Sequence, residues 1–156
     1  MKKLLLTCVY SGLLLVSTPL FAKRAEINKL LELAKKEAGE ITPQTLKTMF
    51  DAEKEVIVLD IRESEQRAEG QIYWDDMLAI TRGNLEFFVL NEIKNKDAVI
   101  VTYCRGGSRG ALAAQTLRNL GFKNATNLKG GLKGWAKAGY PIETGLGVTK
   151  LSKDEE

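Results

Sequence analysis

The sequence feature that most constrains the fold is the run at residues 98–103, which is apolar and β-branched with almost no polar side chain. A strand with one face in water alternates polar and apolar residues, so this run predicts a strand buried on both faces. Residues 55–60 have the same character, and residues 77–80 and 124–128 predict two weaker strands. Helical segments separate these runs, which indicates a parallel sheet covered by helices on both faces.

The first 22 residues have the layout of a secretory signal peptide. Lys2 and Lys3 precede a largely apolar stretch, and Ala22 supplies the small residue after which cleavage is expected. We therefore expect residues 1–22 to be removed and the mature protein to be periplasmic or secreted. An uncleaved membrane anchor is the alternative, although Pro19 and several small polar residues interrupt the apolar stretch.

Composition excludes several functional classes for this chain of 156 residues. The net charge is +3, and it falls close to zero without residues 1–22, which carry two lysines and no acid. Charge therefore predicts no nucleic-acid partner. The chain contains no histidine, which removes the usual general base and the commonest zinc ligand, so no metal site is expected.

Cysteine usage singles out one residue of the mature chain. The sequence contains two cysteines, and Cys8 would leave with the signal peptide, so Cys104 has no partner for an intrachain disulfide. Structural cysteines of exported proteins normally occur in pairs. Cys104 is therefore an inert buried thiol, an intermolecular bridge or a reactive group.

Helical spacing and turn signals divide the chain into regions. Residues 23–40 predict an amphipathic N-terminal helix laid on its own domain, and Thr42 predicts the N-cap of a helix that continues to about Phe50. The main domain is expected over residues 41–143, and the polar residues 144–156 predict a flexible tail. Further helices are expected at residues 63–68, from an Asn84 cap to about Ile93, at residues 111–120 and at residues 132–138.

The loop that follows the strongest strand carries the chemistry. Gly106 and Gly107 have no Cβ, so they can adopt positive φ and let successive backbone N–H groups converge on one point. Ser108 is expected to cap the helix that follows. Together the N–H groups and the helix N-terminus predict an anion site centred on the sulfur of Cys104.

Two arginines of the same loop strengthen this interpretation. Arg105 and Arg109 add positive charge beside Cys104, and each of these features favours the thiolate over the thiol. The sequence therefore predicts that Cys104 is a nucleophile activated by its electrostatic surroundings, without a general base. The alternative is a tight strand-to-helix loop that happens to contain a small apolar cysteine.

The segment from Tyr103 to Arg109 is similar to the active-site loop of the rhodanese family of sulfurtransferases. Three further motifs extend the resemblance over about residues 41–143: Leu59-Asp60-Ile61-Arg62-Glu63, Gly70-Gln71-Ile72, and Lys129-Gly130-Gly131 with Trp135 downstream. The resemblance implies a rhodanese-like α/β fold with a five-stranded parallel sheet and helices on both faces. Gln71 departs from the family, which commonly has histidine there, but this position is not the nucleophile.

The resemblance also implies an activity. A sulfurtransferase of this kind moves sulfane sulfur from thiosulfate or polysulfide, through a persulfide on Cys104, to cyanide, sulfide or a protein thiol, without a metal or organic cofactor. The N-terminal helix and residues 81–86 suggest the exported polysulfide- and thiosulfate-handling branch, whose members tend to be homodimers. A sulfur carrier that delivers sulfane sulfur to a partner enzyme is the alternative, and a silent scaffold is disfavoured by the intact loop.

Phosphatases and arsenate reductases with a similar loop are a further alternative. Their loops need five residues between cysteine and arginine, whereas four residues separate Cys104 from Arg109. The narrower loop suits a persulfide better than a tetrahedral phosphate.

The candidate substrate-binding residues are Arg105, Gly106, Gly107, Ser108, Arg109, Arg62 and Arg82. For three of the arginines a second interpretation remains open. Arg62 could form an ion pair with Asp60, which is expected to be structural; Arg82 could be a solvated surface charge; and Arg109 could brace the loop through a buried carboxylate. Trp74 and Trp135 are expected to serve packing.

Overall fold

The computed structural model of the protein describes residues 18–150, with side chains from residue 23 onward. Its centre is a five-stranded sheet in which all neighbouring strands run parallel. In spatial order the strands are β1 (Glu40–Ile41), β6 (Asn124–Leu128), β5 (Val99–Tyr103), β2 (Ile57–Asp60) and β4 (Met77–Ala79). The predicted α/β fold with a five-stranded parallel sheet is confirmed. Of the five strands in this sheet, β1 was not predicted from the sequence.

The two strands with the fewest polar positions lie side by side in the middle of the sheet. Within β2 and β5 the side chains of Val58, Ile100 and Val101 are fully buried. The register places Asp60, at the end of β2, opposite Tyr103, at the end of β5. Because carboxyl ends of parallel strands meet at one edge, Cys104 follows Tyr103 at the edge where α/β proteins place their sites.

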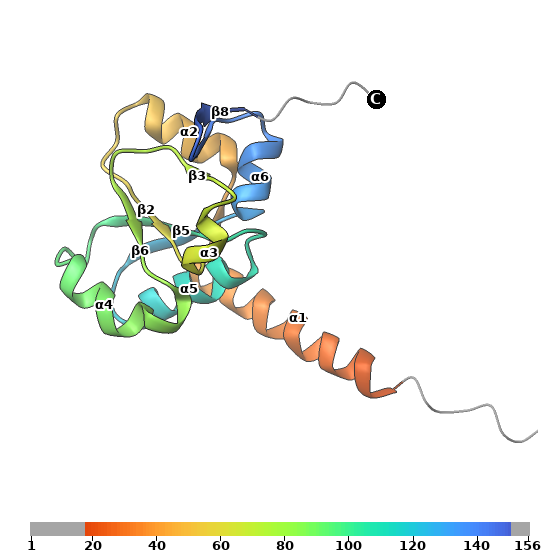
Figure 1. The fold of residues 1–156 in the computed structure, drawn as a ribbon. Helices are drawn as coiled ribbons and strands as arrows, with labels where there is room; N and C mark the ends of the chain where they lie inside the picture. Colours follow the sequence, from red (N-terminus) through yellow and green to blue (C-terminus); the bar gives the residue numbers. More distant parts are fainter. Residues whose placement is uncertain (1–17, 151–156) are drawn as a thin grey trace, which may run out of the picture.

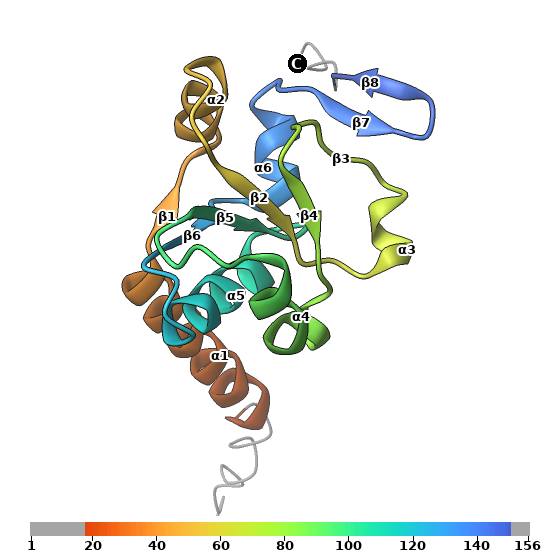
Figure 2. The ribbon, with the colours of Figure 1, turned by 90° about the vertical axis from the view of Figure 1, so that its left-hand side faces the viewer.

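Helices cover both faces of the sheet (Figures 1 and 2). One face carries α1 (Thr18–Ala38), α4 (Leu85–Glu92) and α5 (Ser108–Asn119), and the other carries α2 (Pro43–Asp51) and α6 (Gly131–Lys137). Each face has its own apolar cluster, which includes Leu85 and Leu117 on the first and Leu46 and Trp135 on the second. The short α3 (Ser64–Arg67) follows β2.

Helix α1 begins at Thr18, before the expected start at residue 23, and packs against α5. Ala34 and Ala38 are buried, whereas Ile27 and Leu30 are about half exposed, so only the second half of the helix lies on the domain. The helix projects from the domain in Figure 1. The predicted signal peptide lies almost wholly outside the described residues. Within residues 18–150 no helix combines the length and apolar character needed to cross a membrane.

The local signals at helix starts had mixed outcomes. Thr42 caps α2 as predicted, because its hydroxyl accepts the backbone N–H of Thr45 at 3.1 Å. Asn84 takes the predicted N-cap position of α4, but its side chain makes no capping bond: a short 3₁₀ helix, η1 (Arg82–Asn84), precedes α4, and the Asn84 amide donates instead to the Thr81 hydroxyl at 3.0 Å. The amide thus bonds back into the 3₁₀ turn and does not bond the first N–H groups of α4.

A second, three-stranded antiparallel sheet was not predicted. It consists of β3 (Gln71–Ile72), β7 (Ile142–Thr144) and β8 (Gly147–Thr149). The hairpin of β7 and β8 continues regular structure to Thr149, past the boundary at residue 144 that polarity suggested. Figure 2 shows this small sheet on the same side of the main sheet as α2 and α6.

Candidate active site

Cys104 lies between the end of β5 and the start of α5, and only 3% of its surface is exposed. Its sulfur accepts a hydrogen bond from the backbone N–H of Gly107 at 3.1 Å. The N-terminus of α5 follows immediately, so the positive end of the helix dipole faces the sulfur. One backbone N–H and the helix N-terminus thus lie at the Cys104 sulfur, which is part of the anion-favouring environment that the sequence predicted.

Two details of this loop differ from the prediction. Gly107 has a φ of 98°, but Gly106 does not adopt positive φ, so one left-handed residue is enough for the turn. Gly107 also takes the N-cap position of α5, and Ser108 is the first helical residue, with its side chain exposed. The left-handed turn at Gly107 redirects the chain by itself and leaves no capping role for the Ser108 hydroxyl.

The N-terminus of α6 holds the loop from the other side. The backbone N–H groups of Leu132 and Lys133 donate to the carbonyl oxygens of Cys104 and Arg105 at 2.8 and 3.0 Å. Gly131 makes this contact possible, because a Cβ at this position would lie 2.2 Å from the Cys104 carbonyl oxygen. The Lys129-Gly130-Gly131 motif thus shapes a turn near the site, as predicted.

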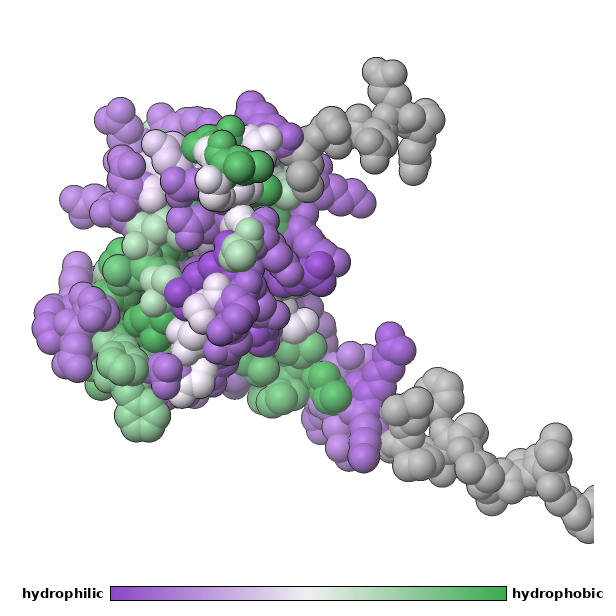
Figure 3. Space-filling model, viewed as in Figure 1, coloured by the Kyte–Doolittle hydropathy of each residue, from purple (hydrophilic) through white to green (hydrophobic). Residues whose placement is uncertain are grey.

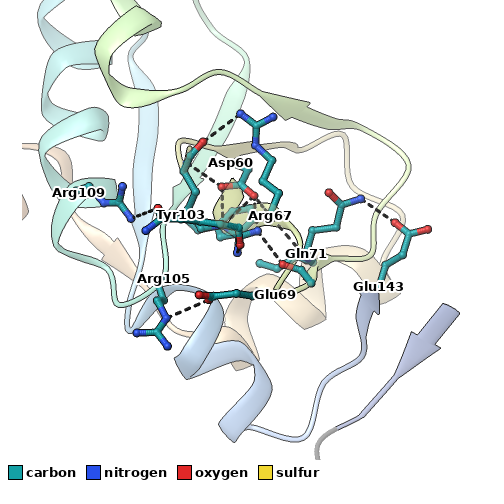
Figure 4. A network of polar contacts seen from close by, with 12 residues as sticks. Asp60, Arg67, Glu69, Gln71, Tyr103, Arg105, Arg109 and Glu143 are labelled. Atoms are coloured by element: carbon teal, nitrogen blue, oxygen red, sulfur yellow. Dashed lines mark hydrogen bonds and ion pairs between the residues drawn. The ribbon is translucent and has the colours of Figure 1, made fainter. Parts of the chain in front are cut away.

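A buried network stands behind the loop (Figure 4). Asp60 accepts hydrogen bonds from the Tyr103 hydroxyl at 2.8 Å and from Nε and Nη2 of Arg62 at 2.9 and 2.6 Å. Burial and the Asp60 carboxylate raise the pKa of Tyr103, so its hydroxyl remains a donor. Burial alone would lower the pKa of Arg62, but its hydrogen bonds and charge interaction with Asp60 raise it. Tyr103 was not recognised from the sequence as part of this network.

The structure favours the ion-pair interpretation for Arg62 over substrate binding. The side chain is fully buried, and its remaining bonds run to the backbone. Nη1 donates to the carbonyl of Gln66 at 2.9 Å, and Nη2 donates to that of Gly70 at 2.8 Å. A buried guanidinium is costly unless its N–H groups are hydrogen-bonded. The two carbonyl acceptors meet this need, and Arg62 thereby holds residues 66–70 at the end of the sheet.

Arg82 is not brought to the loop. Nη1 pairs with the Glu86 carboxylate at 2.9 Å, and Nη2 donates to the Thr116 hydroxyl at 2.9 Å. Thr116 is in the third turn of α5, about 12 Å along the axis from Ser108 at 1.5 Å per residue. The structure therefore separates Arg82 from the residues around Cys104, against the predicted anion contact.

Arg105 and Arg109 each contact the segment around α3. Arg105 is half exposed and pairs with Glu69 at 3.0 Å, and Arg109 Nη2 donates to the side-chain oxygen of Gln66 at 2.7 Å. The brace predicted for Arg109 exists, but an amide takes the place of the expected carboxylate. The surface over α3 is mainly hydrophilic, whereas apolar side chains gather over α4 (Figure 3).

Other motif residues lie in the framework. Gln71, at the position that departs from the rhodanese pattern, donates to the Glu143 carboxylate at 2.8 Å and joins β3 to β7. Trp74 stacks on Phe50 with ring centroids 3.9 Å apart, and Trp135 is buried with its indole N–H on the Pro141 carbonyl. Both tryptophans pack, as the sequence predicted.

Comparison with known proteins agrees with this geometry. The family model for the rhodanese-like domain matches residues 42–138. A sulfurtransferase of Allochromatium vinosum is 32% identical over 67% of this chain and 94% of its own length. The thiosulfate sulfurtransferase GlpE of Actinobacillus succinogenes is 29% identical over 72% of this chain and 96% of its own length.

A solved structure extends the comparison to the fold. The polysulfide-sulfur transferase homodimer of Wolinella succinogenes has a TM-score of 0.66 and 26% identity, and the match covers 76% of this chain and 88% of that one. The matched residues 42–138 include the whole Cys104 loop, its buried support and the turn at Gly131. This chain belongs to the family of rhodanese-like domain proteins, which contains sulfurtransferases.

Proposed function

We propose that the protein transfers sulfane sulfur from thiosulfate or polysulfide to a thiophilic acceptor through a persulfide on Cys104. The observation that carries the proposal is the Gly107 N–H hydrogen bond to the Cys104 sulfur at the N-terminus of α5. This arrangement stabilises negative charge on the attacking thiolate and, after transfer, on a persulfide. The rhodanese-like family and its sulfurtransferase relatives support the same reaction class.

The loading step needs no net oxidation. The Cys104 thiolate attacks the outer sulfur of thiosulfate, a new S–S bond forms, and the S–S bond of thiosulfate breaks. Its electron pair leaves with sulfite, or with a shorter chain when the donor is a polysulfide. Arg105 is the exposed cation of the loop and is the residue that we propose contacts the anionic donor.

The discharge step regenerates the thiolate. Cyanide, sulfide or a protein thiolate attacks the outer sulfur, and the electron pair of the persulfide bond returns to Cys104. The reaction is a ping-pong exchange between sulfur atoms that requires neither a metal nor an organic cofactor.

A periplasmic or secreted location and a homodimer complete the proposal. A signal peptide over residues 1–22 would direct export, and its cleavage would leave a chain in which Cys104 has no intramolecular disulfide partner. The polysulfide-sulfur transferase of Wolinella succinogenes, which has a similar fold, is a homodimer, and this supports a dimer here. Fractionation of the expressed full-length chain, with N-terminal sequencing and light scattering of the mature form, tests both points.

A sulfur carrier is the second candidate, and the burial of Cys104 favours it. With 3% of the residue exposed, a persulfide there would be shielded from solvent, which suits storage until a partner docks. A carrier predicts a long-lived persulfide that cyanide discharges slowly, whereas an enzyme with free turnover predicts fast discharge.

Intact-mass spectrometry of the mature protein tests the proposed function. After incubation with thiosulfate or polysulfide, the wild type is expected to gain the mass of one sulfur atom, and cyanide is expected to remove it. A Cys104→Ser variant is expected to gain nothing. If the wild type gains no sulfur from either donor, the proposed reaction is wrong, and phosphatase and arsenate reductase assays follow.

A further inference from the structure

The arginine directly after the nucleophile is paired with a carboxylate from another part of the chain. Arg105 Nε lies 3.0 Å from Glu69 Oε2, across 36 positions in sequence, and the two side chains are 52% and 45% exposed. Figure 4 shows Arg105 and Glu69 pointing toward each other from the loop and from the segment after α3. A negative charge therefore sits beside the site that, under the proposed function, receives anionic donors.

The backbone on either side of Glu69 is held by the buried Arg62 side chain. The next residue, Gly70, gives its carbonyl oxygen to Arg62 Nη2 at 2.8 Å, and Gln66 gives its carbonyl oxygen to Nη1 at 2.9 Å. Arg62 is in turn paired with Asp60 inside the protein, where both side chains have no exposed surface. The backbone around Glu69 is thus anchored in the core, whereas the side chains of Glu69 and Arg105 reach solvent.

An exposed ion pair of this kind is weak and exchangeable. Solvent screens the attraction, and holding two long side chains in one geometry costs entropy. A dianion such as thiosulfate can therefore displace the carboxylate from the guanidinium. To do so it must compete with Glu69 for Arg105, and the negative charge of Glu69 repels it. The carboxylate occupies Nε of Arg105, so a donor that binds this edge of the guanidinium does so in the fraction of molecules in which the pair is open.

We propose that Glu69 is a specificity-determining residue that competes with the anionic sulfur donor for Arg105. This inference rests on the proposed function. In the ping-pong reaction the carboxylate reduces the rate of loading by small dianions, and its influence falls on the donor step. The reacting cyanide is the monoanion, which attacks the outer sulfur and needs no contact with Arg105 in the proposed mechanism, so the acceptor step is not expected to depend on Glu69.

The test compares Glu69→Gln with Glu63→Gln in the mature protein. Glu63 is exposed, lies before α3, makes no side-chain cap bond, and gives the same charge change as a matched control. Since exposed pairs contribute little, kcat/KM for thiosulfate is expected to rise about threefold in Glu69→Gln and to stay within about 1.5-fold of wild type in Glu63→Gln. In both variants kcat/KM for cyanide is expected to remain unchanged.

A second background separates competition for Arg105 from general repulsion. In an Arg105→Gln protein, Glu69→Gln is expected to give no further gain in kcat/KM for thiosulfate, because the contested cation is gone. A gain that persists there, an equal gain in Glu63→Gln, or no gain in Glu69→Gln would overturn the inference. Wild-type protein that fails to take up sulfur would instead overturn the proposed function, so the two failures are distinguishable.

Discussion

The hydroxyl of Tyr103, the residue directly before the candidate nucleophile, donates a 2.8 Å hydrogen bond to Asp60 on the neighbouring strand. The β2–β5 register places the two residues opposite each other. Asp60 also carries the ion pair with Arg62, which holds the segment opposite the loop. The backbone of Cys104 and the segment that faces it are therefore tied to one buried carboxylate, and this predicts how variants of the network behave.

Tyr103→Phe is expected to lower the free energy of unfolding by about 1–2 kcal/mol, because a buried carboxylate loses one of its donors while keeping Arg62. Urea unfolding of the wild type and the variant measures the change. Sulfur loading at Cys104 is expected to persist, since Phe fills the same space. An unchanged midpoint would show that the hydroxyl bond contributes nothing net.

The same hydroxyl predicts a response to alkaline pH. Burial and Asp60 raise the pKa of Tyr103 in the folded state above the value of about 10 in the unfolded chain. The unfolded state then releases this proton first, so the stabilisation is fully present below about pH 10 and is lost as pH rises above it. Between about pH 8 and 11, the wild type is expected to lose more unfolding free energy than Tyr103→Phe. Equal losses would contradict the assignment.

Arg62→Met and Arg82→Met distinguish a buried arginine from an exposed one. The first leaves Asp60 without its cation in the core and is expected to cost about 3–5 kcal/mol of unfolding free energy. The second removes a part-exposed pair with Glu86 and is expected to cost less than about 1 kcal/mol. Chemical denaturation measures both. A stable Arg62→Met protein with impaired donor binding would restore Arg62 as a substrate contact.

Gly131→Ala is expected to disturb the loop from outside it. The added Cβ would lie 2.2 Å from the Cys104 carbonyl oxygen, and φ of 56° is unfavourable for alanine. A loss of about 2 kcal/mol or more in unfolding free energy is expected, together with slower loading of Cys104. Gly106→Ala is the matched control for the unfolding free energy, because its Cβ would meet open space and its φ is not positive. An equal loss of unfolding free energy in both variants would refute the packing argument.

Much of the fold could be predicted because local patterns encode it. Residues 55–60 and 98–103 have no polar face, so they had to become central strands buried between helices. Thr42 and Pro43 marked a helix start through groups that bond within a few residues. In contrast, β3, β7 and β8 are only two or three residues long, and the pairing of β3 with β7 joins positions about 70 residues apart. Short strands of this kind leave too little pattern to recognise.

The candidate site divides in the same way. The sequence by itself determined the position of Cys104 after a strand, the glycine turn before a helix and the charge of Arg105, because these depend on neighbours along the chain. Only the tertiary structure decided which arginine faces which acceptor. It buried the Arg62–Asp60 pair, brought Arg82 to Thr116 of α5 and set Glu69 beside Arg105. A long side chain takes the partner that the register of strands and the packing of helices bring within about 3 Å, and sequence spacing does not encode that distance.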